Sequence, residues 1–443
     1  MSLFGAMNTA ISGLTAQSNA FGNISDNVAN SQTVGYKRVD TTFVDYLTTS
    51  NATVNNSGAV VARPQYVNNV QGTITQTDNP LGLAIAGQGF FAVSQLTGQI
   101  NNIPTFNPQQ YYTRAGDFQL DKNGYLVNTA GQFLNGWPVN SQTGVVNQNT
   151  LNPIQVTQTV YNPVATANVT ISANLPATPA TGTAIPGAPI SSAIDVYDAL
   201  GTVHTVNLNW VKNASDDWTV SVDVPNDVAA PARGSAQVQF GPTTSGNPVP
   251  SGTIGAITPS APPPVITATP YASNTAAQLS FSTDFGSGPQ NITLNLGTYG
   301  QTNGITQYAG TQYNLRGLTQ DGVPPGSFAS VTTQANGNIV VNYDNGQARV
   351  IAQVPVVTFN APDELQRQDG QSFTATLESG TPLAEAPSTN GAGNLVTESV
   401  ESSNVDIATE FSKLIVAQRA YTASTKMVTT ADDLLQQTID MKR

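Results

Sequence analysis

The chain has 443 residues but no cysteine and a single histidine, His204. Without cysteine it can hold neither a disulfide nor a thiolate metal site, and cysteine usage assigns no redox compartment. A nucleophilic triad needs a serine elbow near the histidine, and none lies there. Because His204 alternates with Val203, Thr205 and Val206, we interpret it as an ordinary strand residue. The sequence offers no catalytic, cofactor-binding or metal-ligating residues, so we expect a protein without enzyme activity or cofactor.

Charge is also scarce, because only 9% of the residues are charged, with 15 basic against 27 acidic residues and a net charge of −12. Such an acidic chain matches neither nucleic acid nor an anionic membrane surface, so we expect protein partners. No apolar run approaches the ~20 residues of a membrane span. Lysine and arginine are absent before Lys37, so the cationic part of a secretory signal peptide is missing. We therefore expect export without a cleaved signal peptide.

Glycine (38 residues) and proline (28) are abundant, whereas apolar residues make up 39% of the chain. This balance is typical of strands joined by many turns. All 28 prolines lie between Pro64 and Pro387, so the two ends of the chain form a separate compositional class. We expect the ends to be helical and the middle to be β-structure.

The carboxy-terminal segment carries an apolar row at a spacing of seven residues, and no glycine or proline follows Gly393. With Phe411 and Ile439 widening it at its ends, the row consists of Ile407, Leu414, Tyr421, Val428 and Leu435. Small residues lie beside it at the same spacing, namely Ala417, Ser424 and Ala431. A seven-residue period sustained over four heptads predicts a helix wound around a second helix. Ser403 followed by Asp406 predicts a capping box at its start.

A second heptad row occupies residues 1–30, where steps of four and three residues alternate. Its members are Leu3, Met7, Ala10, Leu14, Gln17, Phe21, Ile24 and Val28, of which only Gln17 is polar. Gly5, Gly13 and Gly22 each cost about 1 kcal/mol of helix propensity relative to alanine, so this segment should be only weakly helical alone. We expect packing against the carboxy-terminal helix to order it.

The predicted fold is therefore mainly β, with a terminal α-helical coiled coil and discontinuous, nested domains. Residues 1–30 and 404–443 form the helical domain, and residues 31–69 an extended polar connector. Residues 70–149 and 311–403 build an inner β-domain, in which Asn123-Gly124 predicts a hairpin. An outer β-domain, residues 150–310, is inserted in it. Whether the inserted stretch is one domain or two stays open.

Three short motifs invite a chemical interpretation, and each has a better structural one. The segment that begins at Asp121 resembles the opening of a calcium loop, but Gln132 stands where the closing glutamate belongs. Gly87 and Gly89 precede a strand, whereas phosphate binding needs a helix N-terminus. Adjacent carboxylates, as at Asp432 and Asp433, do not face one another on a helix. We interpret them as turns and solvated surface.

Motifs at both ends resemble those of the bacterial flagellar rod and hook protein family. The amino-terminal match covers residues 12–14, 26–30 and 33–37, the carboxy-terminal match residues 403–406 and 415–421, and an internal match residues 87–93, 112–118 and 135–137. The family signature falls on Ala29, Asn30, Thr33, Gly35, Tyr36, Lys37, Asn404, Val405, Asp406, Ala417, Gln418 and Arg419. Rod members lack the large central insertion, so length favours a hook member.

The resemblance implies a structural subunit that polymerises into the flagellar hook, the flexible tubular joint that transmits motor torque from rod to filament. It implies an extracellular location, export unfolded through the type III apparatus, and contacts with itself and with rod, hook cap and hook–filament junction proteins, but not with nucleic acid or membrane. A distal rod protein is the alternative. A secreted β-rich adhesin is a weaker one, because it would predict a signal peptide and gives the terminal rows no role.

The resemblance also gives the two heptad rows a task. We expect them to pack against each other within a subunit and between neighbours, around a central channel, while weakly charged β-domains slide as outer shells. The expected interface residues are Leu3, Met7, Ala10, Leu14, Phe21, Ile24, Val28, Ile407, Phe411, Leu414, Tyr421, Val428, Leu435 and Ile439.

Overall fold

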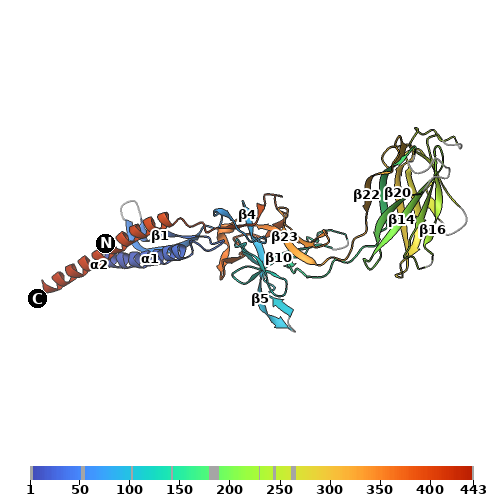
Figure 1. Cartoon of the computed structure of the whole chain (residues 1–443). Coiled ribbons are helices and arrows are strands. Elements are labelled where there is room, and N and C mark those ends of the chain that lie inside the picture. Colours follow the sequence, from blue (N-terminus) through green and yellow to red (C-terminus); the bar gives the residue numbers. More distant parts are fainter. Residues whose placement is uncertain are drawn as a thin grey trace. The chain divides into compact units, whose positions relative to one another are not determined.

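The computed structural model describes residues 3–50, 55–100, 103–140, 143–178, 189–228, 230–242, 246–260 and 266–441. These residues are mainly strand, and their two α-helices, α1 (Leu3–Ala29) and α2 (Ile407–Asp440), belong to the two ends of the chain (Figure 1). The prediction of a β-rich chain with terminal helices is confirmed. The chain divides into two compact units. Residues 1–158, 329–342 and 348–443 form unit 1, and residues 159–328 and 343–347 form unit 2.

Unit 1 begins with α1 and ends with α2. Its strands before the inserted unit are β1 (Val39–Ser50), β2 (Asn55–Tyr66), β3 (Ile74–Gln76), β4 (Leu83–Ala86), β5 (Phe91–Ile100), β6 (Ile103–Phe106), β7 (Tyr111–Thr113), β8 (Gln119–Leu120), β9 (Leu126–Val127), β10 (Gln132–Pro138) and β11 (Asn152–Pro153). After it follow β23 (Phe328–Thr333), β24 (Asn338–Tyr343), β25 (Ala348–Gln353), β26 (Val356–Thr358), the 3-10 helix η1 (Pro362–Glu364), β27 (Gln366–Gln368), β28 (Ser372–Thr374), β29 (Leu383–Glu385), β30 (Asn394–Thr397) and β31 (Ser399–Glu401).

The two helices of unit 1 lie side by side and antiparallel, and α1 also packs against strands β1 and β2 (Figure 1). The rings of Phe21 and Tyr421 meet edge to face with 6.2 Å between centroids. Gly13 faces α2, since a Cβ built on it would lie 3.7 Å from the Ser424 hydroxyl. The terminal rows thus come together within one copy of the chain.

Strands β1 and β2 pair antiparallel over most of their length, so these residues of the predicted extended connector are extended strands that pair with each other. The reason lies in α1, which supplies a surface for one face of the hairpin. Asn23 Nδ2 donates to the Thr41 hydroxyl at 2.8 Å, and the Val60 amide donates to the Ser12 hydroxyl at 3.0 Å. This polar stretch has little apolar periodicity of its own, and its two strands are stabilised because α1 covers one of their faces.

Strands from before and after the insertion pair with one another in unit 1. β3 pairs with β31, β4 with β30, and β7 with β28, all antiparallel. The β7–β28 pair belongs to a larger sheet, which runs β23-β24-β25-β10-β5-β7-β28-β27. Around Phe90 and Phe373, whose ring centroids lie 5.7 Å apart, side chains of both blocks share one hydrophobic cluster. The chain therefore returns after the insertion to complete the same β-structure.

Unit 2 contains two sheets. The first joins β13 (Ile190–Tyr197), β14 (Val203–Ala214), β15 (Asp217–Asp223), β16 (Ala232–Phe240) and β17 (Ile254–Pro259) in sequence order. The second contains β12 (Asn168–Pro176), β18 (Thr267–Ala268), β19 (Ala276–Asp284), β20 (Pro289–Thr298), β21 (Ile305–Tyr308) and β22 (Asn314–Gln320). Buried residues of both sheets form one core that includes Trp210, Trp218 and Tyr299. One shared core makes this unit a single domain, which answers the question that the sequence left open.

The boundaries of unit 2 differ from the predicted 150–310. Residues 150–158 belong to unit 1, and residues 311–328 belong to unit 2 because β22 pairs with β12. His204 lies on β14 opposite Val196, as expected of a strand residue. Its ring stacks on Phe285 with 4.0 Å between centroids, and its Nε2 lies 3.3 Å from Asp198 Oδ2.

Candidate assembly site at the terminal helices

The start of α2 is fixed by Asp406. Its Oδ1 accepts a hydrogen bond from the Thr409 amide at 2.8 Å, so Asp406 is the N-cap and the helix begins at Ile407. Hydrogen bonds from Thr409 lower the pKa of Asp406. The predicted capping box, with Ser403 as the cap, is therefore wrong by three residues, because an aspartate caps as well as a serine. Asn404 and Val405, two other signature residues, lie just before the cap.

The most buried residues of the α2 face that meets α1 are mainly small. Ala417 and Ala431 are buried, with Glu410 one heptad before Ala417, and Leu414, Ser424, Val428 and Leu435 are half-buried. Small side chains let the two helix backbones approach closely. The other large members of the predicted set, Ile407, Phe411, Tyr421 and Ile439, are each more than 40% exposed, although the Tyr421 ring also meets that of Phe21.

The residues of the predicted row on α1 differ in how deeply they are buried. Ala10 and Ile24 are buried, whereas Met7, Leu14, Phe21 and Val28 are half-buried. The side chain of Leu3 lies outside the described residues. Three buried residues that the row did not include also face into the contact, namely Ala16, Ala20 and Asn27. A helix covered on two sides, by α2 and by the hairpin, buries more than one heptad row.

Asn27 joins the three elements of this region. Its Nδ2 donates to the Val39 carbonyl at 2.9 Å and to Glu410 Oε2 at 3.1 Å. Its Oδ1 accepts from the Val39 amide at 2.9 Å and from the Tyr36 hydroxyl at 3.2 Å. The side chain is 1% exposed. A buried amide with all of these bonds made fixes α1 against both α2 and β1.

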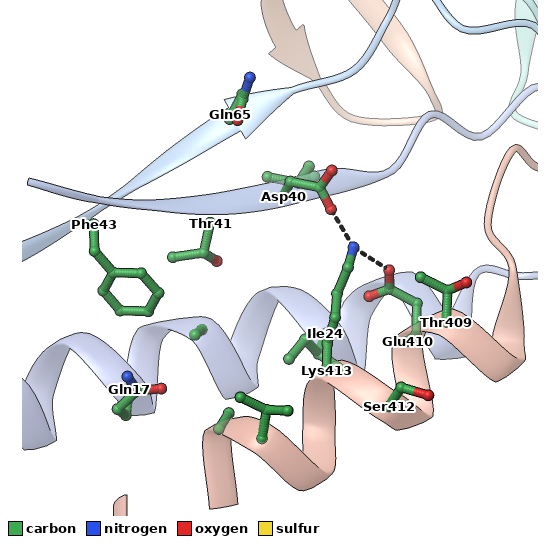
Figure 2. A pocket seen from close by; sticks show the side chains of 14 residues that line it. Gln17, Ile24, Asp40, Thr41, Phe43, Gln65, Thr409, Glu410, Ser412 and Lys413 are labelled. Carbon is green, nitrogen blue, oxygen red and sulfur yellow. Dashed lines mark hydrogen bonds and ion pairs between the residues drawn. The ribbon is translucent and has the colours of Figure 1, made fainter. Parts of the chain in front are cut away.

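A groove of about 600 Å³ lies between α1, β1 and the first turns of α2 (Figure 2). Its walls are largely apolar and include Ile24 and Phe43. At one end Lys413 Nζ lies 2.6 Å from Asp40 Oδ1 and 2.7 Å from Glu410 Oε1. Burial alone would lower the pKa of Lys413, but the hydrogen bonds to Asp40 and Glu410 outweigh it and raise the pKa.

A second polar cluster lies where the chain passes from the helices into the β-structure. Glu401 Oε1 accepts from Lys37 Nζ at 2.5 Å, and its Oε2 from Arg114 Nη1 at 2.9 Å. The Gly72 amide also donates to Glu401, at 2.8 Å. All three charged side chains are nearly fully buried. Burial lowers the pKa of Lys37 to about 8 and also lowers the pKa of Arg114, although Glu401 opposes both shifts.

Other signature residues surround this cluster. Asn404 Oδ1 accepts from the Arg38 amide at 2.7 Å, and its Nδ2 donates to the carbonyls of Val67 and Val70. The Arg367 guanidinium lies over the Tyr36 ring at 4.4 Å, while burial raises the pKa of Tyr36. Gly35 has φ +69°, and a Cβ there would lie 2.3 Å from the Ala115 nitrogen.

The remaining signature residues play local parts. Thr33 donates to Asn30 Oδ1 at 3.2 Å just after α1 ends. Ala29, Gln418 and Arg419 are exposed, and the structure assigns them no role within one copy. Sequence reasoning missed Glu401, Arg114, Glu410 and Asp40, because a lone charged residue in a β-rich stretch carries no pattern that marks it as buried or paired.

Within the described residues there is no group of side chains that could hold a metal ion, and no helix is long and apolar enough to cross a membrane. What the geometry supplies is a helical pair with apolar surface left over and a groove beside it.

Four family models match the chain in order. They are the flagellar basal body rod protein (residues 7–37), the flagellar hook protein FlgE/F/G D1 domain (84–174), the flagellar basal body protein FlaE D2 domain (166–323) and the C-terminal part of the basal body rod FlgEFG proteins (396–441). The flagellar hook protein FlgE of Brucella abortus is 32% identical over the whole of both chains. The chain belongs to the flagellar hook protein family.

A more distant relative aligns over nearly the same length. The flagellar hook protein FlgE of Salmonella typhimurium is 27% identical over 98% of this chain and 99% of its own. The crystal structure of Helicobacter pylori flagellar hook protein FlgE2 covers 74% of this chain at 13% identity, with a TM-score of 0.48. As a family member, the chain is a structural subunit of the flagellar hook, which lies outside the cell and serves motility, and subunits of this family polymerise.

Proposed function

We propose that the chain polymerises through the region formed by α1, the β1–β2 hairpin and α2, and so builds the flexible tube that passes motor torque from rod to filament. The observation that supports this is the apolar surface that one copy leaves uncovered on α2. Its large members are Ile407, Phe411, Ile415, Tyr421 and Ile439. Apolar residues that recur along one helix call for a partner, and a second copy is the partner that a hook subunit always meets.

The proposal includes the rest of the expected assembly. Residues 1–30 and 404–443 act as the helical interface domain, and two β-domains complete a nested chain whose weakly charged surfaces slide as the hook bends. Rod, hook cap and hook–filament junction proteins are the proposed end contacts. Export is proposed to pass through the type III apparatus without a cleaved signal peptide. The scarcity of charged residues supports the sliding of the β-domains, because few charges form few directional ion pairs across the surfaces that move.

The test is Phe411→Ser. Phe411 is 52% exposed in one copy, so its loss should lower the free energy of unfolding of the monomer by about 1 kcal/mol and leave it folded. If its exposed half is buried in the polymer, its removal costs about 1 kcal/mol per contact. We expect the critical concentration for polymerisation, measured by sedimentation, to rise about fivefold, since 1.4 kcal/mol is a factor of ten.

Leu377→Ser is the matched control. Leu377 is 96% exposed but lies outside the terminal helices, and its replacement should leave the critical concentration unchanged. Equal effects of the two substitutions would refute the assignment of the interface to the helices.

A further inference from the structure

α2 carries another heptad row beside the face that meets α1. We name it the outer row, and it consists of Val416, Ala420, Ala423, Met427, Thr430, Leu434 and the C-cap Met441, with polar Gln437 at the remaining position of the period. Val416 also lines the groove beside α1, and Ala420 is half-buried. Val416, Met427 and Met441 are 67%, 61% and 82% exposed, although all three are large and apolar. An apolar row with a seven-residue period over this length matches the surface of a partner helix, because the contacts offered by a flat or irregular surface do not repeat every seven residues. The occupant of the outer row is therefore a helix.

A ridge of charged residues runs directly beside the outer row. Its members are seven residues apart and stand one position before Ala420, Met427, Leu434 and Met441. They are Arg419, Lys426, Asp433 and Asp440. All four are exposed, and the ion pairs among the described residues involve other side chains. Such flanking positions determine how neighbouring helices align. The first half of the ridge is basic and the second half acidic, so the helix is complementary to a copy of itself.

The charge order selects one parallel alignment. With no shift, like charges lie side by side at all four positions. A shift of one heptad makes one opposite pair and two like pairs. A shift of two heptads, about 21 Å along the axis, places Asp433 beside Arg419 and Asp440 beside Lys426 of the neighbour and makes no like pair.

The direction of that shift follows from the apolar residues. When the acidic half of one helix meets the basic half of its neighbour, Phe411 of the neighbour lies level with residue 425, between Ala423 and Met427. Ile415 then lies level with residue 429, on the other side of Met427. The proposed shift also brings Gln418 and Thr422 of the neighbour to the outer row, whereas the opposite shift would bring Thr429, Gln436 and a single large apolar residue, Ile439.

An antiparallel neighbour would also pair opposite charges, but it would use the outer row of both copies. Such a contact closes a symmetric dimer and leaves Phe411 uncovered. Phe411 and the outer row lie about 140° apart around the helix at 100° per residue. A contact that joins two different faces repeats from copy to copy without closing, as a polymer requires.

We propose that the outer row of α2 receives the α2 helix of a second copy, parallel and shifted by two heptads, with Phe411 and Ile415 of that copy against Met427. Asp433 and Asp440 then lie beside its Arg419 and Lys426. This inference rests on the proposed self-assembly and specifies its partner, alignment and register. An unshifted neighbour, an antiparallel dimer and a helix of another protein are the alternatives.

Crosslinking tests the register, because the chain has no cysteine of its own. Full-length chains with Arg419→Cys and Asp433→Cys, two heptads apart, are polymerised and treated with a short bismaleimide. The matched control carries Arg419→Cys and Asp440→Cys, three heptads apart and equally exposed. We expect a ladder of crosslinked oligomers on a denaturing gel that is at least tenfold stronger for the first pair.

The outcomes separate the two levels of the proposal. Failure of the unsubstituted chain to polymerise would refute the proposed function and this inference with it. Polymers in which the 419–433 pair crosslinks no better than the control would overturn the inference alone. Dimers formed by the 419–440 pair would show the antiparallel contact instead, and no crosslinks between copies with either pair would point to a different occupant.

A charge exchange provides a second, independent measurement. Asp433→Lys with Asp440→Lys makes the ridge wholly basic and should raise the critical concentration about tenfold at low ionic strength, where surface charges are little screened. Adding Arg419→Glu and Lys426→Glu restores opposite pairs in the same register and should return the critical concentration to near its original value. A fourfold variant that polymerises no better than the double variant would overturn the inference.

Discussion

Glu401→Gln should loosen unit 1 where the helices join the β-structure. The Glu401 carboxylate is fully buried and is the shared partner of Lys37 and Arg114. The glutamine has nearly the same shape, but it leaves two buried cations without a counter-charge. Removing one partner of a buried ion pair costs about 3–5 kcal/mol. Here the lower figure applies if Lys37, whose pKa burial has lowered to about 8, gives up its proton.

Hydrogen exchange measures this cost locally. Every 1.4 kcal/mol changes the equilibrium constant for local opening about tenfold, so a cost of about 3 kcal/mol should accelerate the exchange of backbone amides in β3, β4 and β31 by at least a hundredfold. Peptides from unit 2 should not change, since Glu401 belongs to unit 1. Glu398→Gln is the matched control, because Glu398 is exposed and lies three residues earlier in the chain. If both variants exchange at the same rate, the buried cluster does not hold this junction together.

Two further predictions concern single groups in unit 1. The pKa of Lys37 is 10.5 in the unfolded chain and about 8 in the fold, so its contribution to the free energy of unfolding should rise with pH from about 8 toward 9.5, below the range in which the tyrosines titrate. Urea unfolding of Lys37→Met should lack this rise when compared with the unsubstituted chain. Parallel pH profiles of the two proteins would contradict the prediction. Gly35→Ala should destabilise unit 1 by more than about 2 kcal/mol, since Gly35 has a positive φ and the added methyl group would meet backbone atoms. Gly22→Ala should stabilise α1 by about 1 kcal/mol, because nothing lies within 4 Å of the added methyl group. Thermal unfolding of both variants is the measurement, and equal shifts of the unfolding temperature would refute the argument.

Much of the architecture follows from the sequence. Heptad spacing without proline predicts the two terminal helices, and the distribution of glycine, threonine and proline predicts the β-rich middle. These patterns are local, and hydrophobic periodicity and turn residues act over only a few positions. The family motifs at the two ends also predicted the hook protein family, which the relatives then showed.

The alignment of the helices was only partly predictable. The sequence contains both the large row with Ile407 and the small row with Ala417, and either could face α1. The structure selects the small row for the intramolecular contact, because α1 is also held by the hairpin at Asn27 and must approach α2 closely. Leu414, Val428 and Leu435 of the large row are half-buried, whereas Ile407, Phe411 and Ile439 stay exposed and become part of the proposed contact with another copy.

By itself, then, the sequence determined the helical ends, the β-rich middle and the family. Only the tertiary structure decided that residues 39–50 and 55–66 pair as two strands on α1, that the inserted unit has one core, and that Lys37, Arg114 and Glu401 meet. Lys37 and Glu401 stand 364 positions apart. No local pattern can mark such a pair, because burial and partnership of a charge depend on which distant segments the fold brings together.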